Sequence, residues 1–192
     1  MDTLHPSFIV GVGGSAGSLS AFKALFDAMP SDTGMAFIVV AHLPPAGTSV
    51  LDQILMRHTD MQVIVASSGM QVRANKVYVI PPNADLSINR HTLKVVSPPK
   101  RMSRQVDCLL ISLAEYWGTH AVGIILSGYL QDGTKGCRHI KANGGTTFAQ
   151  DLSAEVSSMP LMAQASGCID FVLAPKKMPE ELLKLSRQPS QQ

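Results

Sequence analysis

Residues 8–17 read FIVGVGGSAG, and this stretch decides the fold. Its first half, 8–12, is an uninterrupted apolar run of the kind found in strands that are buried on both faces. A glycine-rich turn follows, and residues 18–29 then carry apolar side chains at helical spacing. A buried strand, a tight turn and an amphipathic helix in this order are typical of a parallel α/β sheet.

The same alternation continues along the chain. The pattern predicts further strands over 35–40, 62–65, 76–80, 121–126, 146–149 and 171–173, and helices over 49–58, 106–117, 134–142, 160–166 and from 179 onward. Two alternating segments, 85–88 and 92–95, flank a polar turn, which predicts an antiparallel hairpin. We therefore predict an α/β fold: a mostly parallel sheet between helical layers, with an antiparallel hairpin at its edge.

Length and composition indicate a single globular domain. The chain has 192 residues, of which 45% are hydrophobic, and this excludes a disordered protein. Because no repeat or linker interrupts the pattern, we expect one domain over 1–186, followed by a polar tail over 187–192. No signal-peptide pattern is present, and the run at 8–12 is too short to cross a bilayer, so we expect a cytoplasmic protein without membrane insertion.

Charge and cysteine usage exclude two other classes of protein. The net charge is +2, the 16 basic residues are scattered, and aromatic residues make up only 5%. A nucleic-acid groove needs a basic track and stacking platforms, so we expect no nucleic-acid partner. Cys108, Cys137 and Cys168 stand far apart without the Cys/His spacing of a zinc site, which predicts reduced thiols and no metal.

Three predicted strands are followed by a hydroxyl, an imidazole and a carboxylate: Ser15, His42 and Asp132. Because the carboxyl ends of parallel strands meet at one edge of a sheet, these side chains are expected to lie close together. Serine becomes a good nucleophile when a histidine accepts its proton and an acid orients that histidine. The G-x-S-x-G turn at Ser15 also precedes a helix, whose free N–H groups suit an oxyanion.

Other interpretations of these residues stay open. Each residue alone has a structural explanation, such as a packing turn, a core histidine or an Asp-Gly turn; their agreement in position favours a triad. The run from Gly11 to Ala16 also matches a dinucleotide fingerprint, which would make the chain a nucleotide-binding module. That fingerprint needs an acidic residue at the end of the second strand, where this chain has Ala41 and His42, so we expect no cofactor. The order Ser–His–Asp differs from that of ordinary α/β-hydrolases.

Several separate stretches resemble the catalytic domain of the CheB-type chemotaxis protein-glutamate methylesterases. They are VGVGGSAGSLSAF, VVAHLPP, VYVIPPNADL, VGIILSGYLQDGTKG, IKANGGTTFAQD and SSMPLMA followed by ASGCIDFVL. The resemblance extends from residue 8 to about residue 175. The tracts DTGMAFIVVAHL and RHTDMQV are most similar to esterase domains that are fused to a receptor methyltransferase.

The resemblance implies a three-layer αβα sandwich and a specific reaction. The reaction is hydrolysis of glutamate γ-methyl esters on the cytoplasmic segment of chemoreceptors, with deamidation of certain receptor glutamines as a second activity. It assigns nucleophile, base and orienting acid to Ser15, His42 and Asp132, and backbone support of oxyanion and imidazole to Ala16 and Tyr129. It also implies a fused or separate methyltransferase or regulatory domain as a partner.

The chain departs from the family pattern beside Asp132. Tyr129 and Leu130 stand where family members commonly have other residues, and Leu130 replaces a glycine. If position 130 needs a positive φ, leucine is strained there. This departure motivates an alternative function, a catalytically weakened esterase-fold module that binds a receptor or signalling partner.

Overall fold

The computed structural model describes residues 5–42, 50–100 and 103–187. Apart from Arg187, the predicted polar tail lies outside the described residues. In the described part of the chain, no helix combines the length and the apolar character needed to cross a membrane.

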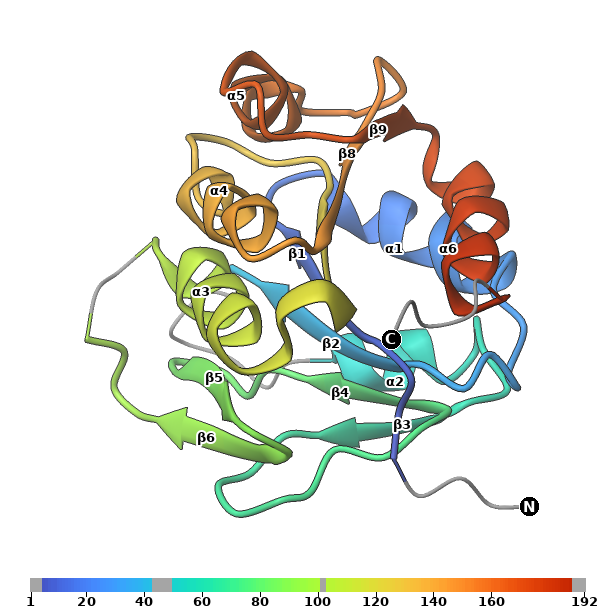
Figure 1. Ribbon diagram of the computed structural model, residues 1–192, viewed down its shortest axis with the longest axis vertical. Coiled ribbons are helices and arrows are strands. Elements are labelled where there is room, and N and C mark those ends of the chain that lie inside the picture. The colour runs from blue at the N-terminus through green and yellow to red at the C-terminus, as the bar shows by residue number, and fades with distance from the viewer. Residues whose placement is uncertain (1–4, 43–49, 101–102, 188–192) are drawn as a thin grey trace.

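Seven strands form one sheet in the order β3-β4-β2-β1-β7-β8-β9, and all neighbouring pairs are parallel (Figure 1). The strands are β1 (Ile9–Gly14), β2 (Ala36–Ala41), β3 (Gln62–Val65), β4 (Lys76–Val79), β7 (Ala121–Ile125), β8 (Thr146–Gln150) and β9 (Phe171–Leu173). The strand order reverses between β1 and β7. In open α/β sheets, ligands bind at the carboxyl ends of the strands beside such a reversal.

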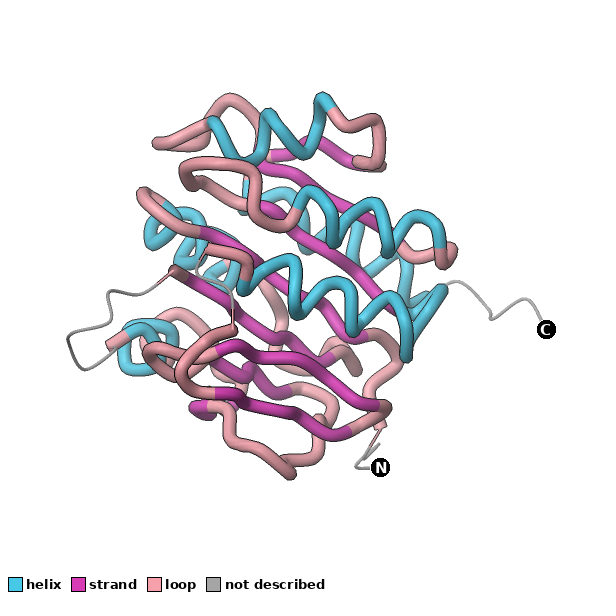
Figure 2. The backbone as a smooth tube through the Cα atoms, turned by 90° about the vertical axis from the view of Figure 1, so that its left-hand side faces the viewer, coloured by secondary structure: helices cyan, strands magenta, loops and turns pink. Residues whose placement is uncertain are grey.

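Helices cover both faces of the sheet, which confirms the three-layer αβα sandwich (Figures 1 and 2). One face carries α3 (Gln105–Trp117), α4 (Thr134–Ala142) and α5 (Ser158–Ala165), and the other carries α1 (Ser18–Asp27), α2 (Leu51–Leu55) and α6 (Met178–Arg187). Short 3-10 turns cover Gly118–His120 and Pro175–Lys177. Each layer closes its own apolar cluster against one face of the sheet.

The predicted antiparallel hairpin is present as β5 (Asp85–Asn89) and β6 (Thr92–Val96). It forms a two-stranded sheet of its own instead of extending the edge of the main sheet. Leu86, Ile88 and Leu93 are buried in the apolar cluster that also contains α3, so the hairpin covers part of that face.

Two glycines of β1 let α3 lie directly against the sheet. A Cβ atom at Gly11 would lie 2.6 Å from Leu110 Cδ2, and one at Gly13 would lie 2.3 Å from Val106 Cγ1. This close approach accounts for the glycine pattern that a dinucleotide fingerprint would also explain. It also brings the first turn of α3 to the carboxyl end of β1, where the candidate site lies.

The helix predicted over 49–58 is shorter in the structure, where α2 covers Leu51–Leu55. Residue 49 lies outside the described residues. After Leu55 the chain tightens into i→i+3 hydrogen bonds, from the N–H of Arg57 to Ile54 O at 3.1 Å and from the N–H of His58 to Leu55 O at 2.9 Å. This tighter winding ends the α-helix.

Candidate active site

Ser15 lies in the turn between β1 and α1. The N–H of Ser15 donates to the carbonyl of Ser127 at 2.9 Å. The carbonyl of Ser15 accepts both the N–H and the hydroxyl of Ser18. Gly17 has a φ of 69°, which glycine adopts without strain. Among the described residues, the N–H groups of Ala16 and Gly17 have no hydrogen-bond acceptor. They precede the first turn of α1, where the helix dipole favours a negative charge.

Ser127 holds this turn from the neighbouring strand. It is fully buried just after β7; its hydroxyl lies 2.9 Å from the carbonyl of Ala16 and accepts the N–H of Val156 at 2.9 Å. The side chain of Gln150 accepts the N–H of Ser127 at 2.9 Å. Ser127 is not among the residues predicted for the site, although a hydroxyl directly after a wholly apolar strand is a usable signal.

Gly128, in the segment that follows β7, lets the backbone approach Ser15 closely. A Cβ atom at this position would lie 2.8 Å from Ser15 Cβ and 2.6 Å from Met159 Sδ. A side chain here would clash with both Ser15 and the Met159 side chain of α5. The glycine after Ser127 is therefore a requirement of the site's geometry.

His42 follows β2, which pairs with β1 so that Gly14 and Ala41 are register partners. The N–H of His42 donates to the carbonyl of Gly14 at 3.3 Å. Ser15 and His42 therefore stand at equivalent places, each one residue after the last paired residue of its strand. The ring lies 2.7 Å from Asp132 through its Nε2 atom and is 19% exposed. Nδ1 is then the ring nitrogen left to accept a proton. Within the described residues, no hydrogen bond joins the Ser15 hydroxyl to the ring.

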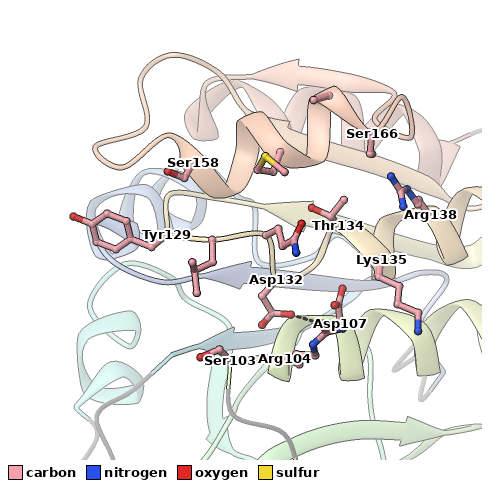
Figure 3. Close-up of a pocket in the computed structure, with 14 residues that line it drawn as sticks. Ser103, Arg104, Asp107, Tyr129, Asp132, Thr134, Lys135, Arg138, Ser158 and Ser166 are labelled. Atoms are coloured by element: carbon pink, nitrogen blue, oxygen red, sulfur yellow. Dashed lines mark hydrogen bonds between the residues drawn. The ribbon is translucent and has the colours of Figure 1, made fainter.

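Asp132 is buried and is held by the first turn of α3. Its Oδ2 accepts the N–H of Val106 and its Oδ1 accepts the N–H of Asp107, both at 2.9 Å, and Figure 3 shows the bond to Asp107. These two N–H groups belong to the helix end that carries the positive dipole. The carboxylate therefore keeps a fixed orientation toward His42.

Asp107 is a second buried carboxylate, and it caps the neighbouring helix in return. Its Oδ1 accepts the N–H groups of Gly133 at 3.0 Å and Gly136 at 2.8 Å, at the start of α4. Burial raises the pKa of Asp107 above 3.8, and the negative charge of Asp132 raises it further, against the backbone donors and Arg104. A polar residue in the first turn of an apolar helix was the sequence signal for this role.

We expect Asp107→Ala to lower the free energy of unfolding by about 1–3 kcal/mol, because the two glycine N–H groups lose their acceptor in a buried place. Asp107→Asn keeps the acceptor and removes the charge. Since the folded pKa is raised, wild type loses stability relative to this variant as the pH rises from 3.8 through that folded value. Urea unfolding across this pH range measures both effects, and a pH-independent difference between Asp107→Asn and wild type would contradict the assignment.

Tyr129 and Leu130 form the exposed part of the loop before Asp132, with 60% and 65% of their surfaces accessible. Leu130 has a φ of 66°, so position 130 does have the positive φ at which a leucine is strained. Left-handed backbone costs a leucine about 1–2 kcal/mol. Within the described residues, no hydrogen bond joins Tyr129 to His42, and support of the imidazole by Tyr129 stays a prediction.

Leu130→Gly is expected to raise the free energy of unfolding by about 1 kcal/mol, because glycine adopts a positive φ without strain. The leucine side chain is mostly exposed, so little packing is lost. Leu130→Ala is the matched control, since alanine keeps the strain and should bring no gain. Equal stability of the glycine and alanine variants in thermal and urea unfolding would show that this φ stores no strain.

Comparison with known proteins identifies the family of this chain. The CheB methylesterase family profile matches residues 10–182. A Geobacter metallireducens protein named protein-glutamate methylesterase/protein-glutamine glutaminase 1 is 34% identical over 91% of this chain and 50% of its own length. A Leptospira interrogans protein whose name gives the same two activities is 29% identical over 95% of this chain and 96% of its own length.

A solved structure supports the same assignment. The Thermotoga maritima CheB methylesterase catalytic domain matches with a TM-score of 0.85 and 29% identity, over 93% of this chain and 98% of that chain. The family profile, the relatives and the structural match each cover most of this chain. The chain belongs to the CheB methylesterase family.

Proposed function

We propose that this chain is a serine protein-glutamate methylesterase in which Ser15 is the nucleophile, His42 the base and Asp132 the orienting acid. The observation that carries the proposal is the 2.7 Å contact between His42 Nε2 and Asp132 Oδ2. It lies at the carboxyl ends of β1, β2 and β7, beside the turn that presents Ser15. Family members named for this activity support the ester hydrolase assignment.

The proposed reaction follows the usual two steps of a serine esterase. Ser15 Oγ attacks the ester carbonyl while His42 Nδ1 accepts its proton, and the imidazolium then protonates the departing methoxide, which leaves as methanol. Water hydrolyses the acyl-enzyme with the same base and releases a glutamate side chain and free Ser15. The N–H groups of Ala16 and Gly17 stabilise the oxyanion that forms in both steps.

The substrate we propose is the cytoplasmic segment of a methylated chemoreceptor, which places the protein in the cytoplasm and in chemotaxis signalling. Attack on a glutamine amide by the same residues releases ammonia, and this is the proposed second activity. The chain spans 50% of the Geobacter relative, so a fused or separate methyltransferase or regulatory domain is a further proposed partner.

The weakened-module alternative has less support. It rests on the loop of Tyr129 and Leu130, and Leu130 does have a positive φ. The strained residue nevertheless leaves the contact between His42 and Asp132 formed at 2.7 Å. The two backbone donors to Asp132 are also in place.

Methanol release from a methyl-esterified chemoreceptor fragment tests the proposal directly. We expect release well above a protein-free blank, and labelling of the protein by a serine-directed fluorophosphonate probe. The same fragment with esters hydrolysed beforehand is the matched control and should release none. Binding of the esterified fragment without methanol release would support the weakened module instead.

A further inference from the structure

A large cavity adjoins Asp132, and its lining residues include neither Ser15 nor His42. Its volume is about 940 Å³, far larger than one glutamyl methyl ester side chain needs. The loop before Asp132, the first turn of α3, the first half of α4 and α5 surround it (Figure 3). The cavity therefore lies beside the triad, where it can hold substrate residues next to the reacting side chain.

Three exposed cations line this cavity: Arg104, Lys135 and Arg138, which we call the cationic groove. Lys135 and Arg138 are three residues apart on α4, so they share one face of the helix. Within the described residues, none of the three has a carboxylate within salt-bridge distance. Their charges are available to a ligand.

Among the described residues, the two carboxylates that line the same cavity form no salt bridge with these cations, although the charge of Arg104 lowers the pKa of Asp107. Asp107 and Asp132 are both buried and accept backbone N–H groups through the oxygens described above. Three charged groups with flexible side chains thus face the solvent, while the two acidic groups face the helix ends. The exposed lining of the cavity is positive.

The rim supplies apolar contacts as well. Tyr129, Leu130 and Met162 line the cavity and are 60%, 65% and 46% exposed. Exposed apolar side chains beside free cations suit a polypeptide segment that carries both apolar and acidic residues. A small anion would use the cations and leave this rim uncovered.

We propose that the cationic groove binds unesterified glutamates that flank the methyl ester in the substrate, and so selects esters within acidic sequence. This inference rests on the proposed function, because it concerns the residues beside the ester that the proposed esterase hydrolyses. Each turnover converts a neutral ester into a carboxylate. Hydrolysis at one position therefore creates a ligand for the groove and favours reaction at a neighbouring ester.

The test uses two peptides that carry one glutamyl methyl ester and differ only in the flanking residues, which are all Glu or all Gln. For wild type, we expect kcat/KM for methanol release to be about tenfold higher with the Glu peptide at low salt, since each partly exposed ion pair contributes a few-fold. The preference should fall toward one at high ionic strength, where exposed charges are screened. The difference should appear in KM more than in kcat.

Charge removal in the groove should erase this preference. Arg138→Gln is expected to reduce the ratio of the two kcat/KM values about threefold, and the combined Arg104→Gln, Lys135→Gln and Arg138→Gln variant should bring it near one. Lys176→Gln removes an exposed charge that lies outside the cavity and should keep the wild-type ratio. Circular dichroism and thermal unfolding check that each variant is folded.

Two outcomes separate this inference from the proposed function. Methanol release from both peptides at equal rates, or an unchanged ratio in the combined variant, overturns the groove and leaves the esterase assignment standing. If wild type releases no methanol, the esterase assignment fails. Fluorescence anisotropy with the unesterified Glu and Gln peptides then still decides the groove, which requires tighter binding of the Glu peptide by wild type than by the combined variant.

Discussion

Ser15→Ala is expected to reduce methanol release by a factor of about one million, which leaves only the residual acceleration that substrate binding and the oxyanion donors supply. Alanine removes the oxygen that attacks the ester. The N–H of residue 15 still donates to Ser127, and Ser18 still bonds to the carbonyl of residue 15, so the backbone should keep its shape. Methanol release from an esterified receptor fragment measures the loss.

Folding and binding controls complete this experiment. The Ser15→Ala variant should unfold at about the wild-type temperature, because the Ser15 hydroxyl of the wild type forms no hydrogen bond among the described residues. It should also bind the esterified fragment and lose its reaction with a fluorophosphonate probe. Equal labelling of wild type and Ser15→Ala would show that a different residue is the nucleophile.

Asp132→Asn is expected to lower kcat about 10,000-fold, the usual effect of removing the orienting acid of a serine triad. An amide at this position donates to His42 Nε2, so the proton moves to Nδ1 and the ring can no longer accept the proton of Ser15. The Asp132 oxygens accept three donors: His42 and the N–H groups of Val106 and Asp107. Since the amide keeps only one oxygen, we also expect a loss of stability of about 1–3 kcal/mol.

Asp107→Asn is the matched control, because it makes the same chemical change in the adjacent buried carboxylate. Both hydrogen bonds to this side chain end on Oδ1, which the amide retains. Its kcat should therefore fall far less than that of Asp132→Asn. A similar loss in the two variants would indicate that the general charge of this region matters and that Asp132 has no specific role at His42.

Much of this architecture follows from local sequence pattern. Buried strands such as β1, β2 and β7 are short apolar runs, and helices such as α3 and α4 have apolar residues at helical spacing, so each element forms largely from its own residues. Because parallel strands align their carboxyl ends, Ser15, His42 and Asp132 could be expected to share one edge. The contact between His42 and Asp132 confirms part of that expectation.

Contacts between distant residues could not be predicted in this way. The roles of Ser127 and Asp107 depend on which backbone N–H groups surround them, and these come from segments far away in the sequence. The backbone strain at Leu130 depends on its positive φ angle, which cannot be read from the presence of a leucine in the sequence. The hairpin's place over the α3 face, instead of at the sheet edge, likewise depends on three-dimensional packing.

The sequence alone therefore determined the α/β architecture, the family resemblance and the identity of the candidate triad, since periodicity and strand ends are local properties. The tertiary structure decided how α3 and α4 hold Asp132 and Asp107, and that Arg104, Lys135 and Arg138 gather in one cavity. Gly11 and Gly13 show how sequence and tertiary structure are related. Their missing side chains are visible in the sequence, but only the folded chain shows that α3 occupies the space they leave.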